Sequence, residues 1–92
     1  MIFVSLARFR KKPTKEMTDD PSTQTEAVKK EMAKEGIKFL NWYWTLGRYD
    51  AVVIAEAPDE RTFMKAMIGL NDFVATETMV AVPREEAIKL VE

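Results

Sequence analysis

The sequence predicts an α+β domain in which a four-stranded antiparallel sheet carries two helices on one face. Apolar segments of strand type alternate with helical segments in the order strand, helix, strand, strand, helix, strand, and a short helix follows. Right-handed crossovers place both main helices on the same side of the sheet. The 92 residues suit a single domain, 1–92, with a thin core.

Four segments have strand composition, because β-branched and aromatic residues dominate them. They are residues 2–9, 37–46, 51–57 and 73–82. Three of them are apolar at both alternating positions, which is typical of strands buried on two sides. In the segment 37–46, strict alternation groups Phe39 with Asn41 and Tyr43. The opposite face then carries Trp42 and Trp44.

Two segments between the strands have helical character. The first runs from about 21 to 35 and ends at Gly36, where a left-handed stop is expected. The sequence does not decide where this helix begins, since Pro21 either breaks a preceding turn or occupies the first turn of the helix. The second runs from about 59 to 70, with Asp59 as its N-cap.

Two further segments connect or follow these elements. Residues 46–50 read as a hairpin turn in which Gly47 supplies a positive φ and Asp50 bonds nearby backbone amides. Replacing Gly47 by Val should therefore destabilise the fold. Pro83 opens the C-terminal helix. Its inner stripe is predicted to consist of Ala87, Ile88 and Val91.

Composition excludes several classes of function. The chain has 14 basic and 15 acidic side chains, so it lacks the basic excess that nucleic-acid binding requires. It has no histidine and no cysteine, which removes Ser-His-Asp and Cys-His mechanisms and the commonest metal ligands. We expect no cofactor and no metal site. No apolar run approaches the roughly 20 residues of a membrane span, and the first residues read as a strand of a cytoplasmic protein.

The two-sided apolar strands predict self-association. Two helices cover one face only, so the other would expose a larger apolar patch than a soluble monomer tolerates. A second copy packing sheet against sheet removes the patch, and a two-fold axis lets it meet itself. We therefore expect a homodimer or a higher homo-oligomer. Replacing Trp44 by Ala should weaken it or lower its melting point.

The central part of the chain resembles a known family. The run of residues 43–50, Tyr-Trp-Thr-Leu-Gly-Arg-Tyr-Asp, leads into the apolar segment 51–59 and resembles the GYD domain family. The glycine, tyrosine and aspartate of that name are here Gly47, Tyr49 and Asp50. The resemblance extends to residues 76–78. It implies a ferredoxin-like βαββαβ domain of the dimeric α/β barrel group, and it implies no particular activity.

Two groups of residues are candidates for binding a small molecule. Asn41, Tyr43 and Trp44, beside Trp42, could form an aromatic wall around a polar group, although such residues more often serve packing. The second group lies in the predicted turn and consists of Arg48, Tyr49 and Asp50.

In the turn group, Arg48 could bind a carboxylate, and Asp50 could act as a base if burial raised its pKa. A plain turn explains the same residues. Glu56 and Glu77 are acidic residues within apolar strands, and such a carboxylate near Arg8 suggests a structural ion pair or a proton relay.

Three hypotheses about function follow. The first is a non-catalytic homo-oligomer with a structural or small-molecule-binding role, which the absence of a clustered acid–base constellation favours. The second is a cofactor-free enzyme, similar to a monooxygenase or an isomerase, acting on a small apolar or aromatic substrate. The third is a regulatory module that senses a metabolite. The sequence identifies neither the ligand nor any reaction.

Overall fold

The computed structural model describes residues 1–10, 29–71 and 74–92. Its named elements, in chain order, are β1 (Ile2–Phe9), β2 (Lys38–Trp44), β3 (Ala51–Glu56), α3 (Glu60–Gly69), β4 (Val74–Ala81) and α4 (Arg84–Lys89). Residues 29–34 are also helical and precede β2. The predicted start of this helix near Pro21 lies outside the described residues.

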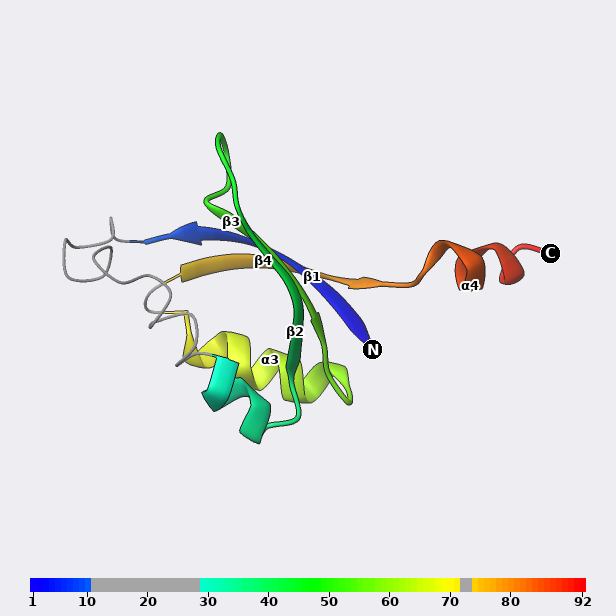
Figure 1. The fold of residues 1–92 in the computed structure, drawn as a ribbon, viewed down its shortest axis with the longest axis horizontal. Coiled ribbons are helices and arrows are strands. Elements are labelled where there is room, and N and C mark those ends of the chain that lie inside the picture. Colours follow the sequence, from blue (N-terminus) through cyan, green and yellow to red (C-terminus); the bar gives the residue numbers. More distant parts are fainter. Residues whose placement is uncertain (11–28, 72–73) are drawn as a thin grey trace.

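The four strands form one antiparallel sheet in the order β2-β3-β1-β4. Residues 29–34 and α3 lie on the same side of it (Figure 1). This arrangement confirms the predicted α+β, ferredoxin-like fold. β1 lies at the centre because its alternating apolar residues can be buried from both sides, whereas β2 and β4 form the edges.

The side of the sheet under the helices, called the helix face here, holds the core. Phe3 of β1 stacks on Phe63 of α3, with ring centroids 4.4 Å apart and planes within 1°. Met32, Ile37 and Ala55 complete the buried cluster with them. Burying one such aromatic side chain contributes about 1.5–3 kcal/mol, so this cluster fixes both helices on the sheet.

The opposite side of the sheet, called the open face here, has an apolar centre and polar margins. The strand register assigns to it Ile2, Val4, Leu6 and Arg8 of β1, Lys38, Asn41 and Tyr43 of β2, Val52, Ile54 and Glu56 of β3, and Ala75, Glu77, Met79 and Ala81 of β4. None of the helices in the described part of the chain packs on this face. Its central side chains on β1 and β3 are half-buried, and Met79 of β4 is exposed.

An irregularity in β2 overturns one sequence prediction. The pairing of β2 with β3 shifts between Phe39 and Asn41, which is the signature of a bulge at Leu40. Phe39 therefore lies on the helix face, with its ring centroid 5.3 Å from that of Trp42. The predicted grouping of Phe39 with Asn41 was wrong because strict alternation does not allow for an extra residue.

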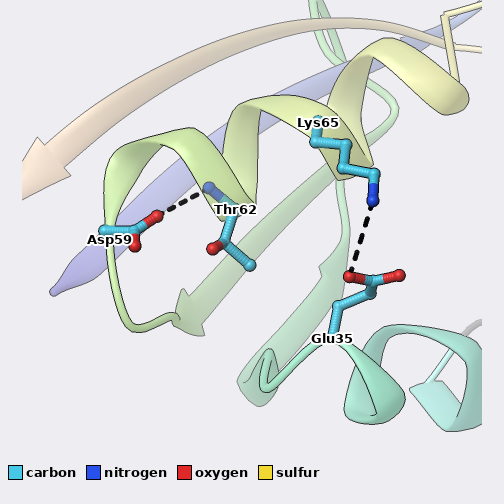
Figure 2. A network of polar contacts seen from close by, with 4 residues as sticks. All are labelled: Glu35, Asp59, Thr62 and Lys65. Carbon is cyan, nitrogen blue, oxygen red and sulfur yellow. Dashed lines mark hydrogen bonds and ion pairs between the residues drawn. The ribbon is translucent and has the colours of Figure 1, made fainter.

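The predicted ends of the helices are confirmed. Gly36 ends the helical segment 29–34 with a φ of +83°, in the left-handed region that favours glycine. Asp59 caps α3: the Thr62 backbone N–H donates to Asp59 Oδ1 at 2.7 Å, as Figure 2 shows. This bond holds the pKa of the Asp59 carboxyl below its ordinary value. Lys65 Nζ of α3 lies 4.0 Å from Glu35 Oε2, an exposed pair that links the two helical regions weakly.

The C-terminal segment departs from its prediction. The predicted inner stripe of Ala87, Ile88 and Val91 is not buried against the sheet, because α4 has no buried residue. Figure 1 shows α4 beyond the end of β4, apart from the sheet and the other helices. The stripe is therefore an outer surface in a single copy of the chain.

Candidate functional site

The turn between β2 and β3 is closed by its own backbone. Thr45 N donates to Asp50 O at 2.9 Å, and Thr45 Oγ1 donates to Tyr49 O. Gly47 has a φ of +98°, as predicted, and a Cβ added there would have no atom within 4 Å. Backbone conformation alone therefore selects glycine at this position.

Asp50 joins this turn to the central strand. Phe9 N donates to Asp50 Oδ2 at 2.7 Å, and Asp50 N donates to Ala7 O at 2.8 Å. The carboxylate thus satisfies the backbone amide at the end of β1, where strand pairing stops. This is the backbone role that the sequence suggests for Asp50, although the amide belongs to a distant strand. An oxygen held in this way is poorly placed to serve as a base.

Tyr49 reaches across the open face to β4. Its Oη donates to Glu77 Oε2 at 2.6 Å, and the Arg8 guanidinium carbon lies 5.8 Å from its ring centroid. Arg8 Nε also donates to the backbone oxygen of Arg48 at 2.9 Å. Arg8, Tyr49 and Glu77 are called the polar cluster below. It lies at one end of the open face, where β1, β4 and the turn meet.

The electrostatics of the polar cluster favour binding over proton transfer. The hydrogen bond to Glu77 raises the pKa of the Tyr49 phenol, and desolvation and the charge of Glu77 act in the same direction. A general acid or base works best when its pKa lies near the working pH, so this shift takes Tyr49 further from that role. The phenol, the carboxylate and the guanidinium remain suited to orienting a ligand.

The predicted aromatic wall is divided between the two faces of the sheet. Asn41 and Tyr43 lie on the open face, whereas Trp42 and Trp44 lie on the helix face. Trp44 is 58% exposed, and its ring centroid lies 5.3 Å from that of Phe9. Asn41 and Tyr43 therefore share a face with the polar cluster, and Trp44 does not.

One contact of the polar cluster was missed by the sequence reasoning. That reasoning associated Glu77 with Arg8 but did not bring Tyr49 to Glu77. The available signal was alternation, which assigns Arg8 and Glu77 each to one face of its strand. The observed register, with Leu6 opposite Glu77 and Arg8 opposite Ala75, puts both on the open face. The missing information was the path of the turn, which carries Tyr49 across β1.

Other features of the described residues are less informative. A shallow, open depression of about 440 Å³ lies between the helical segment 29–34 and the start of β2 and is lined by Lys29, Ala33, Gly36, Ile37, Lys38 and Phe39. It is remote from the polar cluster. Within residues 1–10, 29–71 and 74–92, no carboxylates group in threes that could hold a metal ion. The helices of that part are all too short or too polar to span a membrane.

The comparison with protein families agrees with the turn and the fold. The family model described as the GYD domain matches residues 3–91. A comparison with curated proteins found no match. The family match includes β1, the Gly47–Asp50 turn and β4, which together build the polar cluster. Since it covers nearly the whole chain, this protein belongs to the GYD domain family.

Proposed function

We propose that this chain is a cytoplasmic, non-catalytic homodimer that pairs through its open face and holds a small molecule beside the polar cluster. The observation that carries the proposal is the apolar centre of that face. This centre consists of Ile2, Val4, Leu6, Val52, Ile54 and Met79. No described helix covers it, and Met79 is 48% exposed.

Self-pairing is the simplest way to remove this surface from water. Burying apolar area contributes about 25 cal/mol per Å², which favours covering the patch. A two-fold axis through the centre of the face lets each copy present the same residues to the other. The chain has a net charge of −1, so long-range repulsion between two copies is small.

The polar margin of the same face supports the ligand site. Small-molecule sites combine an apolar wall with a few fixed polar groups. Pairing two open faces would supply the wall, while Arg8 and Tyr49 would supply the polar groups. Tyr49 is held by Glu77, so it is oriented before a ligand arrives. The ligand that fits is a small, mostly apolar molecule with one polar end.

Binding is favoured over the enzymatic alternative by two contacts. Asp50 is occupied by the Phe9 amide, and Tyr49 is hydrogen-bonded to Glu77. The Asp50 carboxylate is thus committed to the backbone of β1. The raised pKa of Tyr49 makes proton transfer by its phenol less favourable at neutral pH.

The dimer is tested with two matched substitutions. Met79→Glu puts a charge in the centre of the open face, and we expect it to shift the protein to monomer because an unpaired charge would be buried. Met64→Glu is the control: Met64 lies on α3, is 59% exposed and lies outside the open face. Sedimentation equilibrium measures both. A Met79→Glu variant that associates as tightly as the Met64→Glu variant would refute pairing through this face.

The ligand is tested by native mass spectrometry of the purified dimer. We expect a reproducible added mass that is lost in an Arg8→Ala variant that still dimerises. A dimer without added mass, even after incubation with a panel of small aromatic acids, would support the proposed assembly and refute the proposed ligand site.

A further inference from the structure

The C-terminal arm, residues 82–92, carries a group of exposed apolar side chains. Val82, Ile88, Leu90 and Val91 are all exposed, and the last two are 78% and 85% exposed. Figure 1 shows that the arm leaves the end of β4 and extends away from the sheet. Four large apolar side chains therefore face solvent on a segment that projects from the body of the molecule.

The helix within this arm lacks internal support. α4 has six residues, whereas isolated helices shorter than about 12–15 residues are marginal in water. Its N-cap is Pro83, and no side chain caps it by a hydrogen bond. Most helical stability in proteins comes from packing an apolar face, and no element in the described part of the same copy buries that of α4. A surface from a second copy would supply that packing.

The size of the open face indicates which molecule supplies that surface. Its strands have six to eight residues. At about 3.3 Å per residue and about 4.8 Å between strands, the flat outline of the four-stranded face measures roughly 20–26 by 20 Å, or roughly 400–500 Å². A stable protein interface buries about 800 Å² of accessible surface on each partner. A dimer built on so small an outline gains from a second contact area.

The position of the arm matches that need. Glu77 and Met79 belong to the open face, and β4 continues from them through Ala81 directly into the arm. A copy seated on the open face would therefore be the nearest foreign surface to the arm. By two-fold symmetry each copy would receive the arm of the other, so the dimer would contain two such contact areas.

We propose that the C-terminal arm of each copy packs on a second copy of this chain, beside the paired open faces. The inference rests on the proposed dimer and adds the segment that completes it. In the dimer, Ile88, Leu90 and Val91 lie against the partner, and α4 is stabilised by that contact. The arm thereby acts as a clasp between the copies.

The first test changes one exposed leucine in the arm. Leu90→Glu should raise the dimer dissociation constant about tenfold or more, because a charge would enter a buried contact. Ile68→Glu is the matched control, since Ile68 is 68% exposed on α3, on the helix side of the sheet. Neither Leu90 nor Ile68 is buried in a single copy, so folding of the monomer should be unchanged in both. Sedimentation equilibrium gives the constants, and thermal unfolding at low concentration checks the fold.

The second test detects the contact directly. The chain has no cysteine, so a Leu90→Cys variant can carry a photoreactive label at that position alone. Illumination should give a covalent dimer, whereas the same label on an Ile68→Cys variant should not. Equal dissociation constants for Leu90→Glu and Ile68→Glu, together with no covalent dimer from position 90, would overturn the arm contact. If Met79→Glu still dissociated the protein, the open-face dimer would survive that result; a monomer in every variant and in the unmodified chain would overturn both proposals.

Discussion

At the β2–β3 turn, three nearby residues serve three different needs of the fold. Gly47 permits a backbone conformation that other residues avoid. Asp50 accepts the hydrogen bond of an amide at the end of the central strand. Tyr49 extends to Glu77 on the far edge strand. The glycine, tyrosine and aspartate of the family motif therefore act on the backbone, the centre of the sheet and its open face respectively.

The backbone role of Gly47 leads to a stability prediction. Gly47→Ala should lower the free energy of unfolding by about 1–3 kcal/mol, and Gly47→Val by more, because a side chain at positive φ is strained. Gly69→Ala is the control: it also meets no atom within 4 Å but lies in α3 without a positive φ. That change should leave stability unchanged or raise it by up to about 1 kcal/mol. Denaturant unfolding measures the three variants, and equal stability of Gly47→Ala and the unmodified protein would contradict the role of φ.

Among the elements, the regular ones were predictable and the irregular one was not. Nearly continuous apolar runs rich in β-branched residues located β1 and β3, and Gly36 and Asp59 marked helix ends, since these signals are local in the sequence. The bulge at Leu40 carries no such signal: Leu40 is an ordinary strand residue, and its insertion is decided by pairing with β3. That single residue moved Phe39 to the other face. The polar cluster also depended on distant contacts: the sequence suggested Tyr49 in the turn and an association of Glu77 with Arg8, but not the contact between Tyr49 and Glu77.

The cap of α3 predicts a pH dependence. The pKa of Asp59 is lowered in the folded state, so its stabilising contribution is present above the ordinary pKa of aspartate and is lost as pH falls through the folded-state value. Asp59→Ala should lower the melting temperature by a few degrees at neutral pH, and the difference should shrink in acid. Asp59→Asn retains a good cap without a titrating group, so its advantage over Asp59→Ala should not change with pH. Melting curves across the acid range would contradict this if the Asp59→Ala deficit stayed constant.

At the scale of the whole molecule, the division of the sheet into two faces governs the outcome of substitutions in β2. The sequence led us to expect that Trp44→Ala would weaken the oligomer or lower its melting point. The structure places Trp44 on the helix face, against Phe9, and places its neighbour Tyr43 on the open face. The two side chains are similarly exposed, at 58% and 53%, but face opposite sides of the sheet.

These neighbours form a matched pair for separating folding from assembly. Trp44→Ala should lower the stability of the single copy by about 1 kcal/mol through the lost aromatic contact, and should leave the dimer dissociation constant within about twofold. Tyr43→Ala should do the reverse, raising the dissociation constant with a smaller effect on unfolding. Thermal melts and sedimentation equilibrium on both variants measure the two effects. The opposite pattern would place the interface on the helix face.

The bulge at Leu40 also bears on what happens when many copies meet at high concentration. β2 is an outer strand, and an outer strand with a regular backbone can template a further strand, then another, until a fibre grows. An extra residue disturbs the spacing of the amide and carbonyl groups along that edge, so an incoming strand cannot keep its pairing past it. The chain can thus present an apolar face to one partner, while the β2 edge does not offer regularly spaced backbone groups with which an unlimited series of further strands could pair.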